Sequence, residues 1–384
     1  MIAVIIPSLN EEDNISFSAQ QIDIGLQKYY KKLPATIINV DSHSQDRTKQ
    51  VFLTTETVNP KVSLDTPYGK RGKGYGVLGG FKYGLKTKAK YFLLIDADVR
   101  SIRPIWIKRL LEPVVNGRFS LVLPLYTRNR YEGNTTNHFC SPLIYGCFNR
   151  DIPQPIGGDF CVNSDLVRDI LKEAKADSDF LYGIDILITL TAIKNKYPII
   201  QKSLGEKIHN PSFSKIIPTS SGAISSSFSF INRHQDSILE DFVKQRGVGT
   251  LPLLKKVVDK NFFHKPQLAK IKKLQKLASE LIRKYQYSRF LCKKTTRWIK
   301  AKRFNLNQEL WTDILSEYLV KLLREELTSE EVVFFAKSLI PLYLFRVLTY
   351  FKEIKNLNNG KIEEIIKEQK QLLRVKLIDK LKYL

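Results

Sequence analysis

The sequence predicts an α/β domain built on a mostly parallel β-sheet, followed by an all-helical domain. In the first half, short apolar runs rich in β-branched residues alternate with polar segments that can form helices. Such alternation is typical of a parallel sheet covered by helices, a Rossmann-like layer. Beyond about residue 213 the apolar residues recur at helical spacing instead. We therefore expect one domain over residues 1–213 and a helical domain over residues 214–384.

Five segments of the first half have the composition and length of strands. They are residues 2–6, 36–40, 61–64, 91–95 and 119–125. In open sheets of this kind, ligands bind beyond the carboxyl ends of the strands. The residues that directly follow each strand are therefore the first candidates for a functional site.

The second half carries three clear helical patterns. Apolar residues recur at i, i+3 and i+4 in residues 274–285 and again in residues 310–322. Thr328-Ser-Glu-Glu331 has the form of a capping box and predicts the start of a third long helix. The apolar stretch 332–351 contains Lys337 and Arg346, which favours a buried helix over a membrane span.

Charge and cysteine content narrow the protein class. The 384 residues carry a formal net charge of +24, and residues 253–303 hold 17 Lys and Arg against the two acids Asp259 and Glu280. Such a segment can bind nucleic acid, an anionic membrane surface or anionic metabolites, or it can keep a protein soluble. The four cysteines form no C-x-x-C pair and the N-terminus has no signal-peptide pattern. We therefore expect a cytoplasmic protein with reduced thiols.

The segment YFLLIDADVR is an apolar strand that ends in Asp96 and Asp98. Alternate residues at a strand end point to the same side, so both carboxylates can address one site. Two carboxylates there suit a hard cation such as Mg²⁺ or Mn²⁺ that also binds diphosphate oxygens. The alternative interpretation is a pair of solvated or helix-capping acids.

Three other segments place polar groups in comparable positions. PSLNEE follows the first expected strand, and DSHSQDRT follows the second. The loop GKRGKG contains Lys73. Its glycines let the backbone approach a phosphate, and the Lys73 ammonium can neutralise a diphosphate. A basic surface turn is the alternative.

Later segments carry further candidates. Arg128 and Arg130 can fork a carboxylate or a phosphate, or pair with surface acids. Asp185 precedes an apolar helix and can be a first-turn acid favoured by the helix dipole. His209 lies near the end of the α/β half, where it can complete a metal site.

In this order, PSLNEE, a D-S-x-S-x-D-x-T turn, a G-K-G segment and a D-A-D strand end resemble the GT-A glycosyltransferases, especially the family 2-like group. The resemblance covers residues 1–213. The segments R-x-R-Y-x-G-x-x-T-N, QPIGGD, YGID and KxHN, joined to a helical second half, narrow it. They resemble the group of mannosylglycerate, glucosyl-3-phosphoglycerate and glucosylglycerate synthases, with GGD in place of a GGE-type element.

The resemblance implies a role for each candidate on the donor side. The residues that would line the nucleotide pocket are Pro7, Asn10, Glu11 and Asp41. The Asp41 carboxylate would lie near the base or ribose. Lys73 would contact the donor diphosphate, and Asp96 would support the donor.

The resemblance also implies a metal and an acceptor site. Asp98 and His209 would bind Mg²⁺ or Mn²⁺ directly, with Asp96 beside them. The acceptor residues would be Arg128, Arg130 and Asn137, which hold the acceptor carboxylate, together with Gly158 and Asp159. Asp185 would orient the acceptor or the donor sugar.

The resulting expectation is a retaining transferase that makes compatible solutes and is a homodimer. It would move glucose or mannose from a GDP-, ADP- or UDP-hexose to glycerate or 3-phosphoglycerate. A first alternative is a membrane-surface glycosyltransferase that acts on a polyprenyl phosphate or a cell-envelope glycan, docked through residues 253–303. A second is a nucleic-acid-binding protein using the same residues. We expect no nucleic-acid partner, because that alternative leaves the carboxylate and glycine motifs unexplained.

Overall fold

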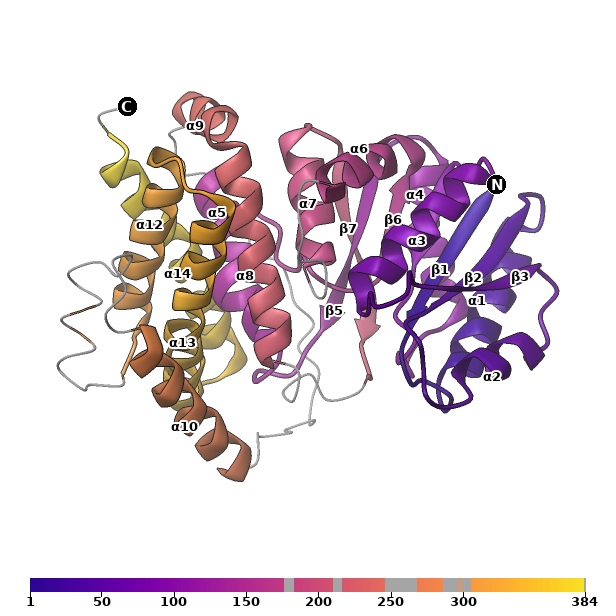
Figure 1. The fold of residues 1–384 in the computed structure, drawn as a ribbon, viewed down its shortest axis with the longest axis horizontal. Coiled ribbons are helices and arrows are strands. Elements are labelled where there is room, and N and C mark those ends of the chain that lie inside the picture. Colours follow the sequence, from indigo (N-terminus) through magenta and orange to yellow (C-terminus); the bar gives the residue numbers. More distant parts are fainter. Residues whose placement is uncertain are drawn as a thin grey trace. The chain divides into compact units, whose positions relative to one another are not determined.

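The computed structural model describes residues 1–175, 183–209, 216–245, 268–285, 296, 298 and 305–382. The chain divides into two units (Figure 1). The first contains residues 1–127 and 154–212, and the second contains residues 128–153 and 213–384.

The first unit is built on a seven-stranded sheet. Its strands are β1 (Ile2–Ser8), β2 (Ala35–Asp41), β3 (Lys61–Asp65), β4 (Tyr91–Leu94), β5 (Leu121–Thr127), β6 (Phe160–Asn163) and β7 (Ile199–Glu206). They lie in the order β3-β2-β1-β4-β6-β5-β7. Only β6 is antiparallel to its neighbours β4 and β5, so the expected mostly parallel sheet is confirmed. The sequence pattern did not predict β6 or β7.

Helices cover both faces of this sheet. They are α1 (Ile15–Tyr30), α2 (Thr48–Thr54), α3 (Lys73–Lys86), α4 (Pro104–Val115), α6 (Ser164–Lys175) and α7 (Ile184–Lys194). Helices α1 and α4 pack on the face that receives Ile2, Val4 and Ile6 of β1, where the main buried core lies. Helix α3 lies on the opposite face, against β1, α6 and α7. Burial on both faces explains why β1 is apolar at almost every position.

Two glycines let α3 lie very close to the sheet. A Cβ atom at Gly80 would stand 2.5 Å from Ile5 Cγ2, and one at Gly84 would overlap the Phe92 ring. Only a residue without a side chain fits at these positions. The close packing fixes the N-terminus of α3, where Lys73 is the first residue, at the carboxyl edge of the sheet.

The second unit is helical, as the sequence predicted. A π-helical turn (Thr136–Cys140) is followed by α5 (Ser141–Phe148), α8 (Ile216–Arg233), α9 (Gln235–Lys244), α10 (Leu268–Tyr285), α12 (Gln308–Arg324), α13 (Ser329–Glu353) and α14 (Asn359–Lys380). Helices α12 and α14 begin at the side-chain caps Asn307 and Asn358. The predicted capping box is present: Glu331 N donates to Thr328 Oγ1, and Thr328 N donates to Glu331 Oε2.

Residues 128–153 were expected in the first domain, but they belong to the second unit. Three contacts explain the difference. Arg130 Nη1 donates to Leu357 O at 2.7 Å, and Trp311 Nε1 donates to His138 O at 2.8 Å. Lys370 Nζ pairs with Asp151 at 2.9 Å. The chain therefore passes into the second unit after β5 and comes back to the first unit before β6, the next strand of the sheet.

Helix α13 is long and apolar enough to cross a membrane by length and composition, but 83% of its most apolar window is buried inside the protein. Its buried residues include the Arg346 guanidinium, which donates to Glu353 Oε2 at 2.8 Å and to Gln369 Oε1 at 3.1 Å. This agrees with the buried helix expected from the sequence.

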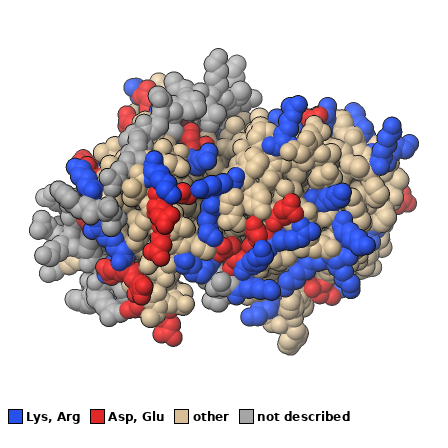
Figure 2. Space-filling model, turned by 90° about the horizontal axis from the view of Figure 1, so that it is seen from above, with Lys and Arg blue, Asp and Glu red and all other residues tan. Residues whose placement is uncertain are grey.

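Most of the basic segment 253–303 lies outside the described residues. Within it, α10 turns Leu274, Ala278 and Ile282 inward and packs on α13. Lys and Arg side chains are spread over the face drawn in Figure 2, interspersed with Asp and Glu. That face shows no single uniform patch of one charge sign.

Candidate functional site

The carboxyl ends of β1 and β2 meet around a buried carboxylate. Asp41, the last residue of β2, accepts hydrogen bonds from Ser44 N at 2.7 Å and Ser44 Oγ at 2.6 Å. Ser8, the last residue of β1, approaches the same carboxylate with its Oγ at 3.3 Å. Asp41 therefore holds the turn that follows β2 in one shape.

The other expected donor-side residues extend this arrangement. Asn10 N donates to Ser44 Oγ at 2.9 Å, and Asn10 Oδ1 accepts from Gln45 N at 2.8 Å. Glu11 N donates to Thr48 Oγ1 at 2.7 Å. Pro7 packs against the backbone of α3 at Gly76. A Cβ added to Gly76 would stand only 3.0 Å from Pro7 Cβ. The loops after β1 and β2 thus form one connected surface beside the N-terminus of α3.

The glycine-rich loop ends in a cation at the start of α3. Gly69 has φ +74° and Gly72 has φ +119°, and both values lie in a region that glycine adopts without strain. Helix α3 begins at Lys73 directly after Gly72. A helix N-terminus carries a partial positive charge and exposed N–H groups, so Lys73 adds a full charge to a region that already favours anions.

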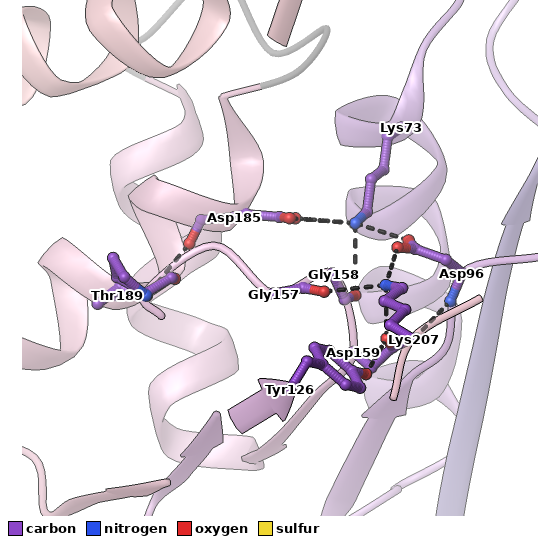
Figure 3. A network of polar contacts seen from close by, with 10 residues as sticks. Lys73, Asp96, Tyr126, Gly157, Gly158, Asp159, Asp185, Thr189 and Lys207 are labelled. Carbon is purple, nitrogen blue, oxygen red and sulfur yellow. Dashed lines mark hydrogen bonds and ion pairs between the residues drawn. The ribbon is translucent and has the colours of Figure 1, made fainter. Parts of the chain in front are cut away.

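The Lys73 ammonium lies between two carboxylates (Figure 3). Its Nζ is 2.7 Å from Asp96 Oδ1 and 3.0 Å from Asp185 Oδ1, and it donates to Gly158 O at 3.3 Å. Asp96 follows β4, whereas Asp185 is in the first turn of α7. The fold therefore brings together three residues that are far apart in the sequence: Lys73 and Asp96, expected on the donor side, and Asp185, expected to orient the acceptor or the donor sugar.

A second lysine completes the group. Lys207, which directly follows β7, places its Nζ 3.0 Å from Asp96 Oδ2, 2.7 Å from Asp159 Oδ2 and 2.9 Å from Gly157 O. Asp159 also accepts hydrogen bonds from Asp96 N at 2.9 Å and from the Tyr126 hydroxyl. The Lys207 ammonium lies 5.2 Å from the centre of the Tyr126 ring. Three carboxylates and two ammoniums thus form one buried network.

The charges in this network shift each other's pKa values. Burial alone would lower the pKa of Lys73, but Asp185 and Asp96 more than offset this and raise it. Burial alone would raise the pKa of Asp96, yet Lys207 and Lys73 hold it well below its usual range. Burial raises the pKa of Asp185, and Lys73 compensates only in part. Asp185 therefore has less electrostatic support than Asp96.

Asp98 and His209 are brought near each other by their backbones. Arg100 N donates to Ile208 O at 2.8 Å, and Ile208 N donates to Ser101 Oγ at 2.8 Å. The loop after β4 and the loop after β7 therefore run side by side, with Asp98 in one and His209 in the other. Within the described part of the chain, no hydrogen bond or ion pair occupies the partly exposed Asp98 carboxylate.

This pair suits a hard divalent cation with an open coordination shell. The described residues contain no group of three or more His, Cys, Asp or Glu that could hold a metal by themselves. Mg²⁺ keeps several waters and takes one or two protein ligands plus substrate phosphates, so two donors are sufficient. Both Asp96 oxygens already bind ammonium groups, so Asp96 is paired with lysines where a metal ligand was expected.

The expected acceptor residues divide between the two units. Gly158 and Asp159 lie in the network around Lys207, in the first unit. Arg128, Arg130 and Asn137 belong to the second unit. There Arg130 binds Leu357 O and Asn359 Oδ1, at 2.7 and 2.9 Å.

Sequence reasoning assigned no role to Lys207 or Tyr126. Lys207 stands two residues before His209 in EKIHN, and its position directly after β7 is the signal that would have marked it. Because β7 itself was not predicted from the sequence, Lys207 was not recognised as a residue at a strand end. Tyr126 lies inside β5, where an aromatic residue is expected for packing alone.

The first half of the chain is similar in sequence to known proteins. Residues 3–182 match the family described as glycosyl transferase family 2. Dolichol-phosphate mannosyltransferase from Pyrococcus furiosus is 26% identical over 182 residues, which cover 44% of this chain and 48% of that protein. The chain therefore spans about half the length of this relative.

Solved structures show the same fold. Glucosyl-3-phosphoglycerate synthase from Mycobacterium tuberculosis, in complex with Mn²⁺, uridine diphosphate and phosphoglyceric acid, superposes with a TM-score of 0.50. The sequences are 21% identical, and the match covers 60% of this chain and 78% of that one. The complex of the same enzyme with Mn²⁺, UDP-glucose and phosphoglyceric acid gives a TM-score of 0.49 at 21% identity, over 60% and 79% of the two chains. The predicted GT-A fold is thus confirmed.

Proposed function

We propose that this protein is a glycosyltransferase that moves a hexose from a nucleotide diphosphate sugar to a small anionic acceptor, since residues 3–182 match glycosyl transferase family 2. Glycerate and 3-phosphoglycerate are the acceptors we propose, in the synthesis of a compatible solute. The observation that carries the proposal is the position of Lys73, a cation at a helix N-terminus beside two carboxylates. The solved enzyme with the similar fold binds phosphoglyceric acid.

On the donor side, the chemistry is electrostatic. Negative charge grows on the departing diphosphate, and the Lys73 ammonium together with the N–H groups at the start of α3 stabilises it. The turn held by Asp41 and Ser44 provides the surface for the base and ribose, beside Asn10. The glycines at 69 and 72 let the backbone approach the phosphates.

A Mg²⁺ or Mn²⁺ ion held by Asp98 and His209 would supply a further positive charge on the diphosphate oxygens. Asp96 keeps its ion pair with Lys207 and holds Lys73 in the absence of the donor. The solved structures of the similar fold contain Mn²⁺ with a uridine nucleotide, which supports this assignment.

On the sugar side, Asp185 faces the Lys73 ammonium and accepts hydrogen bonds. We assign it the orientation of a sugar hydroxyl or of the acceptor hydroxyl that attacks the anomeric carbon. No covalent nucleophile is needed for this step, and we propose retention of the anomeric configuration.

The buried Cys147 and Cys161 form no disulfide, which supports a cytoplasmic location.

A second candidate acceptor follows from the curated relative, which is a dolichol-phosphate mannosyltransferase. A polyprenyl phosphate is also an anionic acceptor, but it lies in a membrane. The exposed lysines of α10, Lys270, Lys272, Lys273 and Lys276, are suited to an anionic lipid surface.

One assay separates these acceptors. Purified protein is given Mg²⁺ or Mn²⁺, UDP-, GDP- and ADP-hexoses, and either glycerate, 3-phosphoglycerate or a polyprenyl phosphate in detergent, and release of nucleotide diphosphate is measured. We expect release with glycerate or 3-phosphoglycerate in the wild type and in Asp165→Ala, an exposed acid of α6, and loss of release in Asp98→Ala. Release with the polyprenyl phosphate alone would replace the proposed acceptor. Absence of donor binding would contradict the proposal itself.

A further inference from the structure

Lys73 and Lys207 share the Asp96 carboxylate, one on each oxygen. Lys73 Nζ is 2.7 Å from Oδ1, and Lys207 Nζ is 3.0 Å from Oδ2. A single ammonium would suffice to neutralise one carboxylate. The second must therefore serve the other acidic groups or a state in which the first is absent.

The two lysines are held very differently. Lys207 has only 7% of its side chain exposed, and its three N–H donors are matched by Asp96, Asp159 and Gly157 O. Asp159 is fully buried. Because every donor is used and Asp159 would be left buried without its counter-charge, Lys207 cannot leave without breaking the whole arrangement.

Lys73 has 19% of its side chain exposed. It is the first residue of α3 and follows the loop that contains Gly69 and Gly72. Its contact with Gly158 O is 3.3 Å long. In Figure 3 the Lys73 side chain enters the network from α3, on the side away from Tyr126 and Asp159. Lys73 is thus the cation that can change partners.

We propose that Lys207 is a positioning residue: it keeps Asp96 and Asp159 paired while Lys73 turns from Asp96 and Asp185 to the donor diphosphate. This inference rests on the proposed function. With Lys207 in place, departure of Lys73 leaves Asp96 with an ammonium on Oδ2. Of the three carboxylates in the network, Asp185 is then the one left without an ion pair. Asp185 then becomes the acceptor that a sugar hydroxyl meets. Without Lys207, Asp159 has already lost its ammonium partner, and the same movement of Lys73 would leave Asp96 without one as well.

The inference predicts that the two lysines act together in nucleotide binding. In a Lys73→Met protein no change of partner takes place, so removal of Lys207 has nothing further to disturb. Lys73→Met and Lys207→Met should each weaken binding of a nucleotide diphosphate about tenfold, and the double variant should also lose about tenfold rather than about a hundredfold. A role in folding alone would lower the stability of Lys207→Met without weakening nucleotide binding by the folded protein.

The experiment is calorimetric titration of UDP, GDP and ADP in the presence of Mn²⁺. The proteins are wild type, the two single variants, the double variant and Lys202→Met, a lysine of β7 outside the network. Thermal unfolding of each protein shows that it is folded. If Lys207→Met does not fold, Lys207→Arg replaces it, because the planar guanidinium keeps the charge but cannot meet the same three acceptors. Lys207→Arg should then lose less nucleotide affinity than Lys207→Met, and its combination with Lys73→Met should again lose no more than Lys73→Met alone.

The outcomes distinguish the inference from the function on which it rests. Binding by the wild type and Lys202→Met, with non-multiplying losses in the other variants, supports the inference. Unchanged binding in Lys207→Met, or losses that multiply, overturns the inference and leaves the proposed function standing. A wild-type protein that binds none of the three nucleotides overturns both.

Discussion

The backbone N–H of Asp96 donates a hydrogen bond of 2.9 Å to the carboxylate of Asp159, which lies 63 residues further along the chain. The bond ties the end of β4 to the turn that precedes β6. Because the same carboxylate also binds Lys207, the backbone position of Asp96 and the charges around its side chain are set by one residue.

Asp159→Asn should therefore destabilise the protein strongly. The substitution keeps the size of the side chain but leaves the buried Lys207 ammonium without one of its two carboxylates. Breaking a buried ion pair in this way costs about 3–5 kcal/mol. Chemical denaturation should show a lower midpoint. Asp165→Asn is the control, since 69% of that side chain is exposed, and its effect should stay within about 0.5 kcal/mol. Equal stability of the two variants would contradict this reading of the network.

Gly158→Ala should abolish most transfer activity. Gly158 has φ +92°, and a Cβ there would overlap Asp96 Oδ2 and stand 2.9 Å from Lys207 Nζ. A displacement of about 1 Å in such a group costs about a hundredfold in rate. Gly117→Ala is a matched control, because Gly117 has φ +70° and open space around it. Both variants should lose about 1–2 kcal/mol of stability from the left-handed backbone, but only Gly158→Ala should lose activity.

Removal of the divalent cation should stop turnover. Chelation by EDTA is expected to abolish nucleotide diphosphate release, and added Mn²⁺ or Mg²⁺ should restore it. In Asp98→Asn the Mn²⁺ concentration for half-maximal activity should rise at least about tenfold, in line with the loss of a charged ligand. A metal titration of the initial rate measures this, with Asp165→Asn as control. Full activity in the presence of EDTA would contradict a role for a divalent cation in the reaction.

Acid should destabilise the helical unit through His138. This side chain is buried beside Arg346, and burial, followed by the Arg346 charge, holds its pKa well below the usual 6.5. As the pH falls below 6.5, the unfolded chain binds a proton that the folded protein cannot, so stability falls by up to about 1.4 kcal/mol per pH unit. Denaturation midpoints measured at several pH values should show a shallower acid slope in His138→Gln. An identical slope in both proteins would assign the acid sensitivity to other groups.

The sequence located the strands that are apolar along their length, because β1, β2 and β4 are buried on both faces. It missed β6, which has only four residues, and β7, in which Gln201, Lys202 and Ser203 interrupt the apolar pattern. Without these strands the antiparallel insertion and the position of Lys207 could not be inferred. Periodicity reports which face of an element is buried, but not which distant element it meets.

The donor-side candidates Asp41, Lys73 and Asp96 were placed correctly at strand and helix ends, because strand ends converge in any parallel sheet. Arg130 could not be assigned in the same way. Its sequence neighbours resemble an acceptor loop, yet the structure shows its guanidinium bound to Leu357 O and Asn359. A guanidinium has donors for several partners, and sequence alone does not say which of them it meets.

Residues 128–153 belong to the second unit although they lie between two strands of the first, and this affects folding during synthesis on the ribosome. The ribosome releases this segment long before α12, α14 and the loop between α13 and α14, which supply Trp311, Lys370 and Leu357 to it. The nascent first unit therefore carries an apolar loop, including Leu143 and Ile144, whose partners do not yet exist. Exposed apolar surface of this kind favours aggregation until the later helices are made. For the same reason, a protein cut after residue 212 would keep its sheet but expose a surface that favours aggregation.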